Sequence, residues 1–104
     1  MSDKAYVLVH GQVNDFERYF GEYIPGVFPL LQKHGGNVLV GTPEPEDAEG
    51  TLPGNWHVVI EFPSMEAAKA WYNDPDYKPL SALRVNELTS GVSLTFLPGF
   101  VPPG

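Results

Sequence analysis

The sequence FPSMEAAKAWYNDPDY at residues 62–77 carries the strongest fold signals of this chain. A strand-like alternation ends at Phe62, and the Ser64 side chain can accept a hydrogen bond from a free backbone N–H group at the start of a helix. Pro75 predicts that this helix ends within a few residues. Between the two signals, apolar residues recur at helical spacing, at Met65, Ala68, Trp71 and Tyr72. The stretch therefore predicts a strand, a capped amphipathic helix and a turn.

A strand and a long helical region precede this stretch. Residues 5–13 alternate, with Tyr6, Leu8, His10 and Gln12 on one face and Ala5, Val7, Val9, Gly11 and Val13 on the other. Asn14 or Asp15 can cap the helix that follows. Pro25 cannot donate a backbone hydrogen bond, so we expect a break over residues 23–26, with Pro25 opening a second helical segment.

The rest of the chain adds three strands and a second helical region. The strands are predicted over residues 37–42, 55–62 and 92–97, the last after Gly91, with an acidic loop over residues 43–54. A short helical segment runs from Tyr77 or Lys78 to Arg84. This order predicts an α+β fold, a ferredoxin-like βαββαβ sandwich with antiparallel sheet order 4-1-3-2. We expect residues 1–97 to form one domain and residues 98–104 an extended tail.

One face of the predicted sheet lacks a cover. Both helices pack on the same face in this topology, so the opposite face, here called the open face, is left exposed. It carries apolar side chains that are unfavourable in water, namely Tyr6, Leu8, Val59 and Leu97. We therefore expect the chain to form a homodimer through its open face.

Composition excludes several classes of partner and site. The chain has no cysteine, which excludes disulfides, thiolate nucleophiles and Cys-based metal sites. Its formal net charge of −7 disfavours nucleic acid and anionic lipid as partners, and no apolar run approaches the ~20 residues of a membrane span. The N-terminus lacks the pattern of a secretory signal, so a cytoplasmic location is expected. The acids of residues 43–54 are interpreted as a solvated loop, with a cation site as the alternative.

The same residues resemble a known family. Glu61 to Ala68, Trp71-Tyr72 and Pro75-Asp76-Tyr77, followed by Leu80, Leu83 and Arg84, are similar to the domain of unknown function 1330 family. The opening Ala5-Tyr6-Val7 and Gly35-Gly36 fit the same pattern. The resemblance implies a ferredoxin-like domain of the dimeric α+β barrel type, in which two sheets enclose a cavity. It implies no activity. The chain departs from the family between Val40 and Asn55, where Gly41 replaces a position that is often basic.

A polar group on the open face is the candidate for catalysis. If Ala5 lies opposite Phe62, then Tyr6 faces Glu61 and His10 faces His57 on the two central strands. Either histidine could act as a general base near neutral pH, with Glu61 orienting an imidazole and Tyr6 donating a hydrogen bond to a substrate oxygen. The alternative is that all four make ordinary structural hydrogen bonds. Their spacing does not favour a metal site.

Two further residues are candidates for ligand binding. Gln12 lies on the same face, and Arg84 could hold an anionic ligand or form a structural salt bridge. No phosphate-binding glycine loop, nucleophile motif or dinucleotide fingerprint is present, so we expect no cofactor. Three functions remain open: a cofactor-free enzyme of the isomerase or monooxygenase kind, a non-catalytic small-molecule binding module, and a structural or interaction homodimer.

Overall fold

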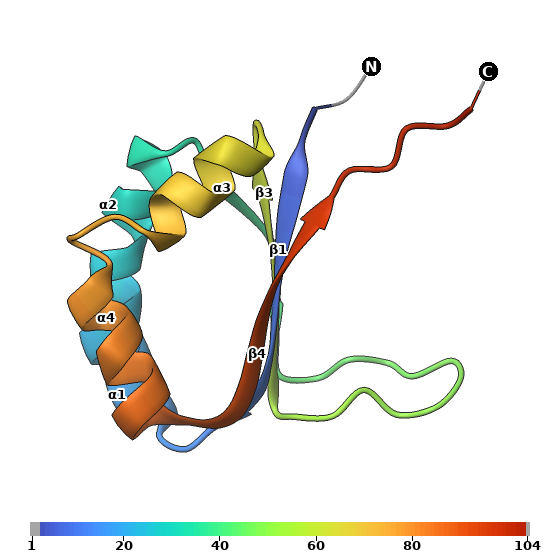
Figure 1. Ribbon diagram of the computed structural model, residues 1–104. Coiled ribbons are helices and arrows are strands. Elements are labelled where there is room, and N and C mark those ends of the chain that lie inside the picture. Colours follow the sequence, from blue (N-terminus) through green and yellow to red (C-terminus); the bar gives the residue numbers. More distant parts are fainter. Residues whose placement is uncertain (1–2, 104) are drawn as a thin grey trace.

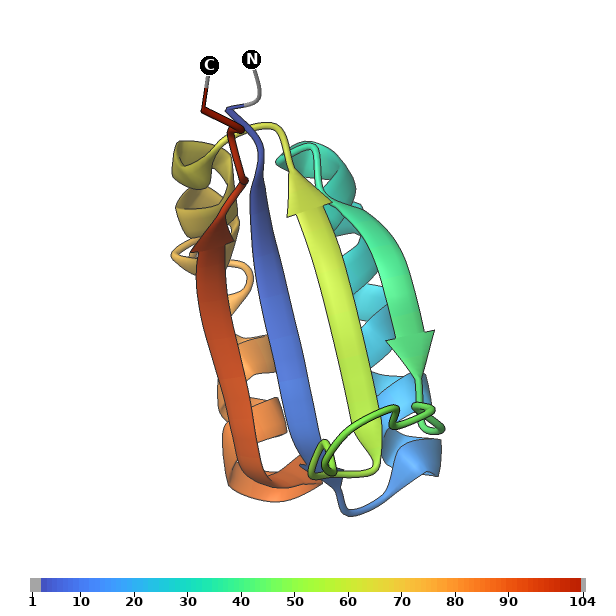
Figure 2. The same ribbon diagram turned by 90° about the vertical axis from the view of Figure 1, so that its right-hand side faces the viewer.

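The computed structural model describes residues 3–103 and consists of one four-stranded antiparallel sheet with all helices packed on one face (Figure 1). The strands are β1 (Ala5–Val13), β2 (Asn37–Thr42), β3 (Trp56–Phe62) and β4 (Thr89–Pro98). Their order is β2-β3-β1-β4, which Figure 2 shows from the open face. The predicted fold class and sheet order are therefore confirmed.

The helical layer consists of two continuous but irregular rods. The first contains α1 (Phe16–Arg18), the π-helical η1 (Tyr19–Tyr23) and α2 (Ile24–Lys33); after α3 (Met65–Tyr72), the second contains α4 (Lys78–Leu83) and the π-helical η2 (Arg84–Leu88). Two caps set where helices begin. The Asp15 side chain accepts from Arg18 N, and the Ser64 side chain accepts from Ala67 N, as the sequence predicts.

A second helical segment, α2, begins at Ile24 with Pro25 in its first turn, as predicted, but the chain remains helical over residues 23–26 instead of breaking. Pro25 lies in the first turn of α2, where a missing N–H removes little, and the N–H of Ile24 bonds to Tyr19 O in the wider π-helical pattern of η1. The helix thus accommodates Pro25 by changing from the π-helical pattern of η1 to the α-helical pattern of α2.

The last strand begins three residues earlier than predicted. Gly91 marks an irregularity in the pairing of β1 with β4: His10 pairs with Ser93 but Gln12 pairs with Ser90. Gly91 has φ +63° and Gly11 has φ +154°, conformations that glycine adopts readily. The glycine that indicates a strand boundary in the sequence is therefore part of a bulge within the strand.

Aromatic residues dominate the core between sheet and helices. Trp71 is 1% exposed and packs against the rings of Phe62, Tyr72 and Tyr77, with ring centroids 4.5–6.3 Å apart. Beside this core, buried Asp74 accepts hydrogen bonds from Lys33 Nζ at 2.9 Å and Asp76 N, and its Oδ2 lies 2.8 Å from His34 Nε2. These bonds, that to His34 foremost, hold the pKa of Asp74 well below its usual range. The carboxylate thereby attaches the end of α2 to the turn after α3.

Two segments project from the open face. The loop between β2 and β3 and the residues after β4 both extend on the side opposite the helices (Figure 1). Residues 99–103 have no regular structure, and Phe100 is 80% exposed. Among residues 3–103, no helix combines the length and apolar character that crossing a membrane requires.

Candidate functional site

The four predicted open-face residues come together in the predicted register. Tyr6 pairs with Glu61 and His10 with His57 across β1 and β3. The Tyr6 hydroxyl donates to Glu61 Oε2 at 3.1 Å, which raises the pKa of Tyr6, and Lys4 Nζ lies 3.5 Å from Glu61 Oε1. The two imidazole rings stack with centroids 6.4 Å apart.

The contacts of these four residues are as consistent with a structural role as with a catalytic one. Both carboxylate oxygens of Glu61 already have partners, Lys4 and Tyr6, and these contacts fix the position of the carboxylate on the sheet. His57 is 4% exposed, and neither of its ring nitrogens has a hydrogen-bond partner among residues 3–103. Gln12 lies exposed on the same face. A catalytic role for these residues stays a prediction.

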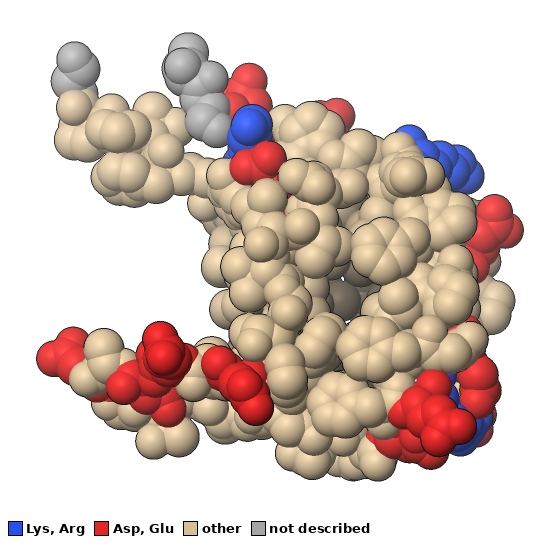
Figure 3. Space-filling view, turned by 180° about the vertical axis from the view of Figure 1, so that it is seen from behind, with Lys and Arg blue, Asp and Glu red and all other residues tan. Residues whose placement is uncertain are grey.

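A cavity of about 290 Å³ lies on the other side of the sheet, beneath the helices. The sheet contributes Val9, Val38, Gly41, Trp56, Val58, Ile60 and Leu94, and the helical layer contributes Tyr19, Phe20, Tyr23, Ile24, Val27, Phe28, Leu31, Trp71 and Arg84. Figure 3, which views the molecule from the side of β2 and α2, shows a hollow surrounded by uncharged side chains. The lining is thus aliphatic and aromatic, with one charged residue.

That charged residue is Arg84, the first residue of η2. It is 3% exposed, and no carboxylate of residues 3–103 lies within ion-pair distance of it. Its Nε has no hydrogen-bond partner there either. Burial acts to lower the pKa of Arg84, but the phenols of Tyr77, Tyr23 and Tyr19 outweigh this and raise it. Arg84 is therefore a buried cation that lines the cavity and has no counter-ion among residues 3–103.

Tyrosine hydroxyls supply the other polar groups near Arg84. Burial raises the pKa of Tyr19 to about 12 and raises the pKa of Tyr23 well above its usual value. The hydroxyls of Tyr23 and Tyr77 lie 2.6 Å apart and share one hydrogen bond. The charge of Arg84 and then the nearby Trp56 act to lower the pKa of Tyr19, although Trp56 Nε1 makes no hydrogen bond of normal geometry. These raised pKa values keep the phenols of Tyr19 and Tyr23 neutral near pH 7.

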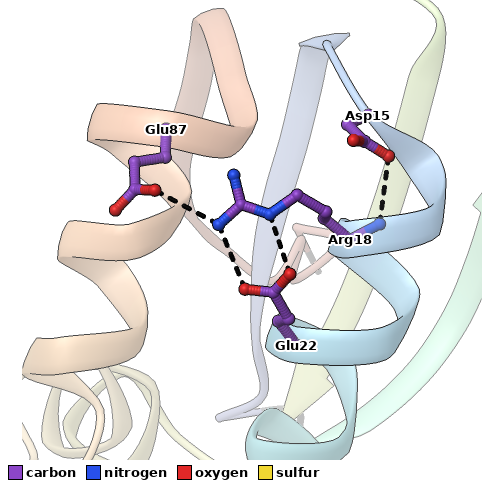
Figure 4. A network of polar contacts seen from close by, with 4 residues as sticks. All are labelled: Asp15, Arg18, Glu22 and Glu87. Atoms are coloured by element: carbon purple, nitrogen blue, oxygen red, sulfur yellow. Dashed lines mark hydrogen bonds and ion pairs between the residues drawn. The ribbon is translucent and has the colours of Figure 1, made fainter.

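Both π-helical segments contribute to the cavity. Tyr19 and Tyr23 belong to η1 and Arg84 to η2, and such segments occur frequently at functional sites. Arg18 joins the two segments at the surface (Figure 4). Its Nε donates to Glu22 at 2.7 Å and its Nη2 donates to Glu87 at 3.2 Å, bonds that raise the pKa of Arg18. This exposed network links η1 to η2 at the protein surface.

The sequence alone did not reveal this cavity. Its aromatic residues recur at helical and strand spacing, which predicts core, and only the single arginine among apolar positions indicated a ligand. The structure separates the predicted site residues: Tyr6, His10, Gln12, His57 and Glu61 lie on the open face, and Arg84 lies beneath the helices. In the part of the chain that the structure describes, no cluster of three or more His, Asp or Glu side chains is placed to hold a metal.

Solved structures share this fold at low sequence identity. A protein of unknown function from Rhodopseudomonas palustris superposes with a TM-score of 0.74 at 18% identity, over 98% of this chain and 86% of that one. The heme-degrader MhuD from Mycobacterium tuberculosis superposes with a TM-score of 0.54 at 19% identity, over 96% and 99%. An uncharacterized NIPSNAP-like domain protein from Burkholderia xenovorans gives 0.53 at 13% identity, over 96% and 89%. No curated protein sequence matches the chain.

The family model with the description "Domain of unknown function (DUF1330)" matches residues 4–99, a span that includes β1, all of the helical layer and β4. This match confirms the resemblance that the residues after Glu61 indicate. The chain belongs to the DUF1330 family.

Proposed function

We propose that this protein binds a small, mainly apolar organic molecule in the cavity between the sheet and the helices. The observation that carries the proposal is the cavity itself, which is about 290 Å³ in volume and lined by aromatic and aliphatic side chains. Ligand sites in proteins are typically concave and apolar, with a few polar groups placed inside. The cavity lies at the lower end of their usual size, which favours a ligand with a single ring.

The cavity does not fit a haem group. MhuD, which shares the fold, has been solved with two hemes bound in its active site. Among residues 3–103, no histidine, cysteine or methionine lines the cavity, and only the phenols of Tyr19 and Tyr23 could ligate iron. The volume is also too small for a porphyrin. We therefore propose a smaller ligand and assign no chemistry that depends on haem.

Filling part of the cavity should weaken the binding of a neutral probe. Gly41 lines the cavity, and a Cβ added there would lie 3.7 Å from the Trp56 ring, an ordinary contact. Gly41→Leu should therefore fold normally but weaken ethylbenzene binding at least about tenfold, because its side chain occupies the ligand's space. The measurement is an NMR titration that follows the indole N–H signal of Trp56.

The matched control is Gly21→Leu. A Cβ at Gly21 meets no atom within 4 Å, so the same substitution changes the surface and leaves the cavity intact. Wild type and Gly21→Leu should bind ethylbenzene alike. If millimolar ethylbenzene leaves the Trp56 signal of the wild type unmoved, the proposed cavity site is wrong.

We also propose that two copies associate through the open face. Leu8, Val59 and Leu97 lie on that face by their register, and Leu97 is 42% exposed. Such an apolar sheet face is stable when a second surface covers it. Catalysis by His10, His57, Glu61 and Tyr6, of the isomerase or monooxygenase kind, would then take place between the two sheets and stays a prediction.

Light scattering tests the association. The wild type should give about twice the chain mass of 11.4 kDa, and Leu97→Glu should give a monomer because it places a charge in the interface. Val85→Glu is the control, since Val85 is 56% exposed in the helical layer, away from this face. A wild-type monomer at micromolar concentration would contradict the proposal.

A further inference from the structure

We infer that the ligand of this cavity is a monocarboxylate, and that Arg84 binds its carboxylate group. The inference rests on the proposed function, because it concerns the same cavity. It goes further by naming the chemical class of the ligand and the residue that selects it.

Arg84 lacks a counter-ion in the part of the chain that the structure describes. A guanidinium remains charged at any physiological pH, and a buried charge is costly unless it is paired. Arg84 is buried, and the carboxylates of residues 3–103 all lie beyond ion-pair distance. Phenol dipoles reduce this cost without cancelling the charge. An anion bound in the cavity would form the ion pair that Arg84 lacks among the described residues.

The cavity lining holds buried hydrogen-bond donors that lack an acceptor among the described residues. Three residues of the cavity lining have a buried nitrogen without a hydrogen-bond partner among residues 3–103, namely Arg84 Nε, Trp56 Nε1 and Trp71 Nε1. Each of these nitrogens is an N–H donor and cannot accept. A complementary ligand therefore brings acceptor oxygens, and a carboxylate presents two of them in the geometry that a guanidinium binds in bidentate fashion.

The charge of the cavity lining favours a carboxylate over a phosphate. Within the described residues, Arg84 is the only Lys or Arg in the cavity lining. A carboxylate carries one negative charge and balances it, whereas a phosphate monoester carries between about −1.5 and −2 near neutral pH and would leave charge unpaired in an apolar site. One guanidinium in an aromatic cavity thus matches a monoanion with an apolar body.

The size of the cavity limits that body. A volume of 290 Å³ is roughly ten times the ~30 Å³ that one water occupies in the liquid. This corresponds to an acid with one aromatic ring and a short side chain. Phenylacetate has this size and is a suitable probe, and phenylacetamide is its uncharged analogue of the same shape.

The test compares the two probes by calorimetry or NMR titration. Wild-type protein should bind phenylacetate at least about tenfold more tightly than phenylacetamide, because a charge-assisted hydrogen bond adds to the shared apolar contacts. Arg84→Met should remove this preference and leave phenylacetamide binding within about twofold. Arg84→Lys should give an intermediate preference, since it keeps the charge and loses the bidentate geometry. Lys69→Met is the control, because it removes the same charge from an exposed position.

Arg84→Met should fold at least as well as the wild type, since it replaces a buried, unpaired cation by an apolar side chain of similar length. The comparison of the two probes in the wild type does not depend on any variant. Equal affinity for phenylacetate and phenylacetamide would overturn the carboxylate inference. If ethylbenzene still binds in that case, the cavity remains a ligand site and only its ligand class is wrong; if no probe binds, the proposed function fails first.

Discussion

Replacing Trp71 with Ala is expected to reduce the free energy of unfolding by about 3–5 kcal/mol, the usual loss when a large aromatic side chain is removed from a core. Trp71 is 1% exposed, and its ring packs against Phe62, Tyr72 and Tyr77. These partners come from β3, α3 and the turn before α4, so the ring connects three parts of the fold. The loss is measured by chemical denaturation.

Trp71→Phe provides the comparison. A phenyl ring keeps most of the apolar contact, so this variant should lose clearly less stability than Trp71→Ala. The Trp71 Nε1 group has no hydrogen-bond partner among residues 3–103, so replacing the indole breaks no hydrogen bond there. A loss below about 1 kcal/mol for Trp71→Ala would show that the core does not depend on this ring.

Replacing Gly11 with Ala is expected to disrupt the end of the central strand β1. Gly11 has φ +154°, and an added Cβ would lie 2.6 Å from Val92 Cα and 2.9 Å from Gly91 O. Both are backbone atoms of β4 and cannot rotate away. The strain and the overpacking each cost about 1–3 kcal/mol, so the variant should melt well below the wild type or fail to fold.

Gly21→Ala is the matched control for this prediction. Gly21 lies in the helical layer with no atom within 4 Å of its added Cβ, so the methyl group meets nothing. Alanine loses less backbone entropy than glycine on folding and should raise stability by about 0.5–1 kcal/mol. Thermal melts of the two variants, followed by circular dichroism, should therefore shift in opposite directions. A Gly11→Ala variant that melts with the wild type would mean that the bulge accepts a side chain.

Local signals in the sequence were enough to predict the fold and the pairing of the central strands. The period-two alternation of residues 5–13 and 55–62 separates the two faces of the sheet, and the Ser64 cap and Pro75 set the bounds of the helix between β3 and α4. The sequence reveals these features because the hydrogen-bond pattern and the side-chain direction of a helix or strand repeat every few residues. These local signals leave the register open to shifts of two residues, and the structure has the register that was assumed, with Tyr6 opposite Glu61 and His10 opposite His57.

The position of the candidate ligand site, by contrast, depends on tertiary packing. Helical spacing places Tyr19, Tyr23 and Trp71 toward the sheet, but it cannot tell whether their rings fill the space beneath the helices or leave a cavity. Helical spacing also cannot tell whether Arg84 forms an ion pair with a carboxylate of the chain. Both depend on how side chains from η1, α3, η2 and β3, far apart in the sequence, pack together. Packing between residues so far apart in the sequence is decided by the whole fold. In this protein it places Arg84 in the lining of an apolar cavity.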